Sequence, residues 1–238
     1  MTGAPDAIVP GLYGLVGGAV NVYVLDGGDA GLIVFDAGLP RGQNAILDLV
    51  RRLGRVPQDV KHILITHGDI DHIGGLKGLH AATGAPITAS AASREYIEQP
   101  RNPPHVPLPM TVLAGLLAHT VRGTAPVAKE VRDGDVLDLA GGLRVIATPG
   151  HTADHISYFW ERERVLIAGD ALNTLGEGLR STQPRITWNM QAAYQSIERL
   201  LALEPAVICC GHGQVWRASE DTGRLAALRA QIRGDQEK

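Results

Sequence analysis

One sequence pattern occurs four times in this chain and constrains its fold more than any other feature. In each case a short apolar run ends in a Gly, His or Asp. The four segments are KHILITHGDIDH from residue 61, RVIATPGH from residue 144, RVLIAGD from residue 164 and AVICCGH from residue 206. Runs of this length and β-branched content predict strands. Strand ends place side chains along one rim of a sheet, so the pattern predicts a binding site at that rim.

The segments around these runs predict both hairpins and helices. Residues 19–38 form two apolar runs with a Gly-Gly-Asp turn between them, which predicts a β-hairpin. Residues 42–53 carry apolar side chains at helical spacing. Further helices are expected over residues 70–83, 91–98, 189–203 and 218–233, and further strands over residues 86–90, 135–142 and 155–160. This alternation predicts a mixed α/β sandwich, and we expect residues 1–238 to form a single domain.

Residues 99–126 interrupt the alternation. Five prolines between Pro100 and Pro109 stiffen the start of this segment and cannot continue a helix. The stretch from Met110 to Val121 then has apolar residues at helical spacing. We expect an insertion that is either a lid favouring apolar substrates, a buried linker helix or a dimer contact.

Composition and charge narrow the classes of function. The formal net charge of −3 and the lack of a basic stripe disfavour nucleic acid and anionic membranes as partners. The two cysteines, Cys209 and Cys210, are adjacent, so a disulfide is not expected and a reducing compartment is the simpler interpretation. No signal peptide or membrane-spanning run is evident. We expect a cytoplasmic protein that acts on a small molecule and is either a monomer or a homodimer.

The strand-end pattern brings four histidines and three aspartates into one candidate metal site. Neutral imidazole and carboxylate together suit zinc, manganese or iron. Seven ligands exceed what one tetrahedral ion can use, whereas two divalent ions sharing a carboxylate and a hydroxide would use them all. The predicted ligands are His67, Asp69, Asp71, His72, His151, Asp170 and His212. Of the other histidines, His155 is expected to support the site or the fold, and His62, His80, His105 and His119 are expected to be surface or core residues.

In order and spacing, these motifs resemble the metallo-β-lactamase superfamily. That family carries H-x-H-x-D-H, a later His in a G-H-T turn, an Asp or Cys, and a final His in a G-H motif. The resemblance implies a four-layered αββα sandwich. It assigns the first metal to His67, Asp69 and His151, the second to Asp71, His72 and His212, and a bridging role to Asp170. It also implies that Asp36 supports the ligands from behind.

Two positions refine the resemblance. Asp170 stands where some zinc enzymes that open β-lactams have a cysteine, so the chain looks more like the lactonase and glyoxalase II members. Asp69 stands where the family usually has a histidine, as in a known HxDxDH variant. Three carboxylates and a hydroxide would balance two divalent ions, and the extra oxygen donor favours manganese or iron relative to a site with more imidazoles. Zinc remains the first expectation.

The expected reaction is hydrolysis of a carbonyl ester or lactone by a metal-bound hydroxide, with Asp71 or Asp170 moving the proton. The alternatives are a phosphodiesterase or nuclease, a thioesterase of the glyoxalase II kind, an iron-dependent oxidoreductase and a non-catalytic metal-binding protein. The thioesterase is less favoured because that family adds a C-terminal helical domain. Asn173 could contact substrate or simply cap its loop. Arg180, Arg185 and Trp188 are further candidates for the pocket.

Overall fold

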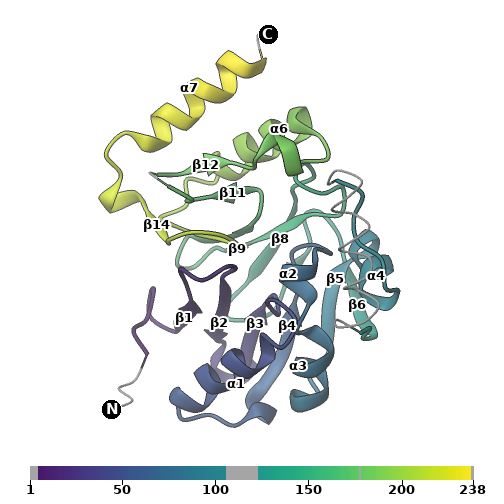
Figure 1. The fold of residues 1–238 in the computed structure, drawn as a ribbon. Helices are drawn as coiled ribbons and strands as arrows, with labels where there is room; N and C mark the ends of the chain where they lie inside the picture. The colour runs from purple at the N-terminus through teal and green to yellow at the C-terminus, as the bar shows by residue number, and fades with distance from the viewer. Residues whose placement is uncertain (1–4, 106–122, 177, 237–238) are drawn as a thin grey trace.

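Two six-stranded β-sheets face each other at the centre of the molecule (Figure 1). The computed structural model describes residues 5–105, 123–176 and 178–236. The first sheet has the order β1-β2-β3-β4-β5-β6, and the second has the order β14-β13-β10-β9-β8-β7. A separate two-stranded sheet pairs β11 (Leu172–Asn173) with β12 (Arg180–Ser181).

The first sheet is antiparallel at one side and parallel at the other. Its strands are β1 (Leu12–Leu15), β2 (Val22–Asp26), β3 (Leu32–Phe35), β4 (Val60–Leu64), β5 (Ile87–Ser90) and β6 (Val127–Val131). The strands β1 to β3 pair antiparallel, whereas β3 to β6 pair parallel. Parallel neighbours need a crossover. Between β3 and β5 these are α1 (Gln43–Arg52), α2 (Ile70–Ile73) and α3 (Leu76–Thr83), and α4 (Ala91–Glu98) follows β5.

The second sheet is mostly antiparallel. Its strands are β7 (Val136–Leu137), β8 (Leu143–Ala147), β9 (Ile156–Trp160), β10 (Val165–Gly169), β13 (Val207–Cys210) and β14 (Trp216–Arg217). The one parallel pair is β10 with β13, and α6 (Met190–Leu201) lies between them in the chain. The C-terminal helix α7 (Arg224–Gln236) packs Leu228 and Ile232 into the same core cluster as α6.

Three buried clusters make the layers. One packs α1 and α3 against the outer face of the first sheet, and another packs α6 and α7 against the outer face of the second sheet. The third lies between the sheets, where the rings of Phe35 and Tyr158 are 5.5 Å apart. Burying each large apolar side chain of this kind contributes about 1.5–3 kcal/mol. The predicted αββα sandwich is therefore confirmed, with helices outside and both sheets inside (Figure 1).

The structure divides the helix predicted over residues 70–83. It consists of α2 and α3, and Gly74 and Gly75 lie between them. A Cβ on Gly74 would lie 2.4 Å from the backbone nitrogen of Pro40, and one on Gly75 would lie 2.4 Å from the carbonyl oxygen of Ala37. The two glycines therefore allow the loop after β3 to pass close to the backbone that follows the HGDIDH segment.

Other predicted boundaries also differ from the structure. Over residues 135–142 only Val136 and Leu137 form a strand. The last helix begins at Arg224, and residues 218–220 form a short 3-10 turn. Strands β1, β6 and β14 were not predicted, because they are short or carry exposed polar residues that weaken the apolar signal.

The predicted insertion at 99–126 is described only at its two ends. Residues 106–122 lie outside the described residues, so its role as lid, linker or dimer contact stays a prediction, as does the assignment of 1–238 to one domain. In the described parts of the chain, no helix is both long and apolar enough to cross a membrane.

Candidate metal site

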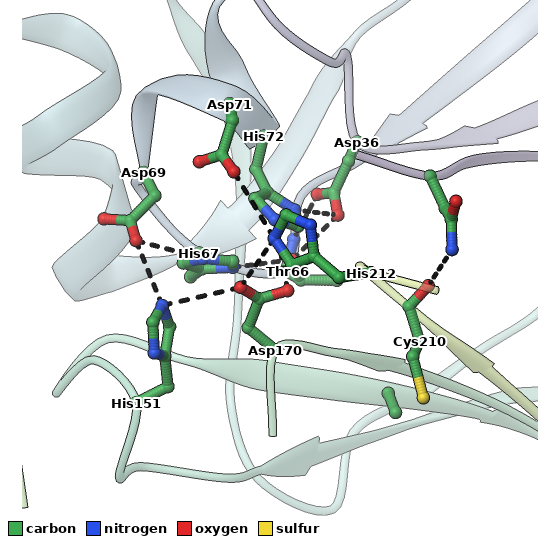
Figure 2. A network of polar contacts seen from close by, with 12 residues as sticks. Asp36, Thr66, His67, Asp69, Asp71, His72, His151, Asp170, Cys210 and His212 are labelled. Atoms are coloured by element: carbon green, nitrogen blue, oxygen red, sulfur yellow. Dashed lines mark hydrogen bonds and ion pairs between the residues drawn. The ribbon is translucent and has the colours of Figure 1, made fainter. Parts of the chain in front are cut away.

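Four of the seven predicted ligands come from the segment after β4: His67 and Asp69 lie in the turn that leads to α2, and Asp71 and His72 lie in α2 itself. His67 and His72 are fully buried, and Asp69 directly precedes the first residue of α2. The backbone amide of His72 donates to the carbonyl oxygen of Asp69 at 2.9 Å, which closes the turn. This turn directs the side chains of Asp69, Asp71 and His72 toward the second sheet (Figure 2).

The other three predicted ligands come from the second sheet. His151 follows β8, Asp170 follows β10 and His212 follows β13. Gly169 and Gly211 each precede a predicted ligand at a point of close approach. A Cβ on Gly211 would lie 2.1 Å from Asp170 Oδ1, so this position has no room for a side chain.

All seven side chains converge on one small region (Figure 2). Asp69 Oδ2 lies 3.1 Å from His151 Nε2 and 3.5 Å from His67 Nε2. Asp170 Oδ1 lies 3.2 Å from His72 Nε2, and Asp170 Oδ2 lies 3.1 Å from His212 Nε2 and 3.6 Å from His151 Nε2. Three sets of potential ligand atoms each fall within 4.8 Å of one another: His67, Asp69 and His151; His67, His72 and Asp170; and Asp71, His72 and His212. The set of His67, His72 and Asp170 shares one histidine with each of the other two sets and thus links them.

A buried network behind the turn orients His67 and His72. Asp36 accepts hydrogen bonds from the backbone amide of Thr66 and from its hydroxyl, both at 2.8 Å, and its Oδ2 also lies 2.8 Å from His72 Nδ1. Because the Thr66 hydroxyl donates to Asp36, it accepts from His67 Nδ1 at 2.9 Å. Both rings therefore carry their proton on Nδ1 and turn the lone pair of Nε2 toward the site.

His151 and His212 are oriented in the same way. His212 Nδ1 donates to the carbonyl oxygen of Ala19 at 2.7 Å. His151 Nδ1 donates at 3.0 Å to the Thr182 hydroxyl. That hydroxyl in turn donates to the Thr187 hydroxyl, which donates to the carbonyl oxygen of Gln183. In all four histidines Nδ1 is thus engaged away from the site and Nε2 faces the site, as a metal ligand requires.

His155 supports the site from beneath Asp170, as one of its two predicted roles required. Its Nε2 accepts the backbone amide of Asp170 at 3.0 Å, and Nδ1 contacts the Thr148 hydroxyl at 2.7 Å. Burial, together with the neighbouring histidines, holds the pKa of His155 well below its usual range. The ring therefore stays neutral and fixes the backbone at Asp170.

Three polar atoms in the site have no hydrogen-bond partner among the described residues. They are His67 Nε2, His72 Nε2 and Asp170 Oδ1, and all three are buried. Leaving a buried polar group unpaired costs about 1–3 kcal/mol. The same three residues form one of the compact sets above, so a cation that accepts their electron pairs fits the donor atoms present.

The carboxylates of the site attract positive charge strongly. Burial would raise the pKa of Asp69 and Asp170, but the surrounding histidines hold the pKa of both well below the ordinary value. Burial would lower the pKa of His212, yet hydrogen bonds to Asp170 and Asp71 raise it to about 10. Protons on histidine or divalent cations can supply the charge that these carboxylates require.

A cavity of about 320 Å³ opens onto the site. Six of its lining side chains are acids or histidines, and they include Asp69, Asp71 and Asp170. Ile70, Pro103, Leu175 and Ile186 supply apolar surface. The cavity can therefore hold a small molecule with an apolar portion beside the polar cluster.

The prediction that His105 is a surface or core residue is wrong. His105 lines the cavity, and its Nε2 lies 3.1 Å from Asp69 Oδ2. The sequence gives no signal for this position, because His105 follows no apolar strand. Asp154, which was not among the predicted site residues, is also buried at the site. Its Oδ2 accepts from the backbone amide of Gly68 at 2.8 Å and from the Ser93 hydroxyl at 2.6 Å, which braces the loop after His67.

The remaining candidates have structural or peripheral positions. Asn173 donates to the carbonyl oxygen of Ser181 and accepts from the amide of Leu175, so it closes its own loop. Arg180 lines a neighbouring cavity, whereas Arg185 and Trp188 do not line the cavity at the site. Cys209 and Cys210 are free, fully buried thiols, as predicted.

Comparison with known proteins agrees with this arrangement. The Metallo-beta-lactamase superfamily profile matches residues 15–212. A probable metallo-hydrolase of Bacillus subtilis, YflN, is 29% identical over 89% of this chain and 87% of its own length. A hydroxyacylglutathione hydrolase of Methylobacterium sp. is 32% identical over 70% of this chain, which spans about half (54%) of that enzyme.

Solved structures show the same likeness. A metallo-beta-lactamase family protein from Thermus thermophilus superposes with a TM-score of 0.69, 28% identity and coverage of 97% of this chain and 82% of its own. A B3 metallo-beta-lactamase described as the first with an active-site glutamic acid superposes with a TM-score of 0.71 and 25% identity, over 97% of this chain and 88% of its own.

Proposed function

The chain belongs to the metallo-beta-lactamase superfamily and is a metal-dependent hydrolase, and from this premise we propose that it holds two divalent metal ions and hydrolyses a carboxylic ester or lactone. Zinc is the metal we favour, with manganese and iron as alternatives. The observation that carries the proposal is the convergence of seven donor side chains, Asp170 among them, in sets that share His67 and His72.

The donor atoms divide between two positions. His67, Asp69 and His151 would hold the first ion, and Asp71, His72 and His212 would hold the second. Asp170 would contact both ions, because it lies near histidines of both positions. Its Oδ2 faces His151 of the first position and His212 of the second, and its Oδ1 faces His72 of the second. Bound divalent ions would lower the pKa of a water molecule so that hydroxide forms near neutral pH, and would polarise the carbonyl of the substrate.

The chain's own residues would orient the substrate and move the proton. Asp71 is the more accessible of the two candidate carboxylates, with a side chain 30% exposed against 11% for Asp170. It can therefore exchange a proton with the leaving group at the cavity mouth, while the backbone of Asp170 is fixed by the hydrogen bond that its amide donates to His155 Nε2.

The lining of the cavity supports a neutral carbonyl substrate over a phosphodiester. Among the described residues that line it there is no Lys or Arg, and the charged groups present are acids and histidines. A phosphodiester would bring one more negative charge beside three carboxylates, without a cationic side chain to receive it.

A thioester substrate is the second candidate. It is supported by the similarity to hydroxyacylglutathione hydrolases, although this chain spans only about half of their length. The same donor set would serve either acyl group, since both reactions develop negative charge on a carbonyl oxygen.

The proposal is tested by metal analysis joined to a substrate panel. Protein purified without chelator should contain close to two divalent ions and should hydrolyse lactones or esters faster than thioesters and phosphodiesters. Asp69→Ala should empty the first position selectively and reduce turnover by at least a hundredfold, while Asp69→His should retain two ions. At most one ion per chain after zinc or manganese loading would contradict the dinuclear site. Cleavage of phosphodiesters alone would contradict the ester assignment.

A further inference from the structure

His105 lies outside the seven-residue set, yet it reaches the same carboxylate. Its side chain is only 5% exposed, and its Nε2 lies 3.1 Å from Asp69 Oδ2. Its ring centroid lies 4.8 Å from that of His151, at an interplanar angle of 63°. Asp69 Oδ2 is thus approached by Nε2 atoms of three histidines, His67, His105 and His151, all within 3.5 Å.

The other ring nitrogen of His105 determines what Nε2 can do. Nδ1 lies 3.0 Å from the carbonyl oxygen of Pro103 and donates to it, because a carbonyl offers no proton. The neutral ring therefore presents the lone pair of Nε2 to a carboxylate oxygen. Two electron pairs at this distance repel each other unless a positive charge lies at the contact.

This is the arrangement of the predicted ligands. His212 likewise donates from Nδ1 to a backbone carbonyl, that of Ala19, and points Nε2 at a carboxylate. His80 provides a contrast within the same chain. Its Nδ1 also donates to a backbone carbonyl, that of Ala85, but it has no ion pair with an acid among the described residues. A hydrogen bond from Nδ1 to a backbone carbonyl is thus not sufficient to indicate a ligand. His105 differs from His80 because its Nε2 also contacts a carboxylate, that of Asp69.

We propose that His105 is a ligand of the metal ion at the first position, so that this position is formed by His67, Asp69, His105 and His151. The proposal rests on the proposed function for the presence of a metal there. Together with the shared Asp170, three imidazoles and two carboxylates would then face this position. A third imidazole also offsets the hard oxygen of Asp69 and shifts the preference of this position toward zinc.

The test uses the zinc-loaded protein and does not depend on turnover. A crystal structure with anomalous scattering data should place His105 Nε2 about 2.0–2.1 Å from one zinc ion. Chelator competition should show that His105→Ala and His105→Gln weaken one zinc position at least tenfold and leave the other unchanged. The matched control, His80→Ala, also loses a bond from Nδ1 to a carbonyl and should bind zinc as the unaltered protein does.

The contrary results are equally specific. If His105 Nε2 remains hydrogen-bonded to Asp69 and more than about 3 Å from every zinc ion, well beyond a Zn–N bond, His105 is a charged partner of Asp69 and the proposal is wrong. The crystal structure of the unaltered protein decides this even if the His105 variants fold poorly. A protein that binds zinc through His105 but hydrolyses no ester would refute the proposed substrate and leave this inference intact. A chain that takes up no zinc, manganese or iron would overturn both.

Discussion

Asp36 shows how a single residue links backbone geometry to the site. Its φ of 64° is in the left-handed region, where a non-glycine residue costs on the order of 1–3 kcal/mol. Aspartate tolerates this region better than most residues. In this conformation its carboxylate meets Thr66 and His72, and three close polar contacts offset the cost.

Asp36→Asn tests whether this network acts on metal binding. The amide keeps the size of the side chain but removes the negative charge that faces His72 Nδ1. We expect metal affinity at the position that uses His72 to fall by about 10–100-fold, as for other partners of metal-binding histidines. Competition with a chromogenic chelator measures this. Asp48→Asn, which alters an exposed ion pair with Arg51, is the control. Equal affinity in both variants would show that Asp36 only supports the fold.

The pKa of His212 predicts proton release on metal binding. Burial lowers this pKa, but hydrogen bonds to Asp170 and Asp71 raise it from 6.5 to about 10, so the metal-free ring is protonated at neutral pH. A cation bound at Nε2 must displace that proton. Apparent metal affinity should therefore rise with pH through the neutral range and level off as the pH passes about 10.

Calorimetry in two buffers of different ionisation enthalpy at pH 7 measures the released protons directly. The unaltered protein should release at least one, and His212→Ala should release about one fewer. Identical heats in the two buffers would contradict the raised pKa.

At the scale of elements, the segment before β2 holds the loop after β13. Asn21 donates from Nδ2 to the carbonyl oxygens of Cys210 and Gly213, both at 2.9 Å, and its backbone amide donates to the carbonyl oxygen of Gly211 at 2.7 Å. Tyr23 adds a bond to Cys210 at 2.7 Å. A strand of the first sheet and the residues before it thereby position His212, a predicted ligand that follows a strand of the second sheet.

Asn21→Ala should weaken this connection. The carbonyl of Gly213 loses the donor from Asn21, so we expect the free energy of unfolding to fall by about 1–3 kcal/mol. Affinity at the position that uses His212 should also fall, whereas that of the first position should not. Thr83→Val is a control of similar stability cost, because it removes a buried hydroxyl bonded to Leu79 and Ala85 away from the site. If both variants lower metal affinity equally, the effect comes from general loss of stability.

The sequence was informative about elements where apolar periodicity and chemistry coincide. His67, Asp170 and His212 stand within three residues of the ends of β4, β10 and β13, so one pattern predicted both the strand and the side chain that follows it. His105 follows a proline-rich segment, and nothing in its neighbours indicates that it lies beside Asp69. Asp154 braces Gly68 across 86 residues of sequence, a contact that only the packed sheets create.

At the scale of the whole molecule, the candidate site lies where the two sheets meet. His67, Asp69, Asp71 and His72 follow the first sheet, while His151, Asp170 and His212 belong to the second. Three negatively charged carboxylates, those of Asp69, Asp71 and Asp170, therefore lie close together where the two sheets meet. A bound cation would therefore connect the two halves of the fold as well as provide the chemistry of the site.

Removal of metal should accordingly destabilise the entire sandwich. An ion present at a hundredfold excess over its Kd stabilises the native state by about 2.7 kcal/mol. For a chain of this length each kcal/mol shifts Tm by about 2–4 °C, so chelation should lower Tm by about 5–10 °C for each ion lost. Calorimetric scans with and without chelator measure the shift, and zinc should restore it. Asp170→Asn, which lacks the charge shared by both positions, should show a smaller response to chelator. An unchanged Tm would mean that bound metal contributes nothing to the stability of the fold.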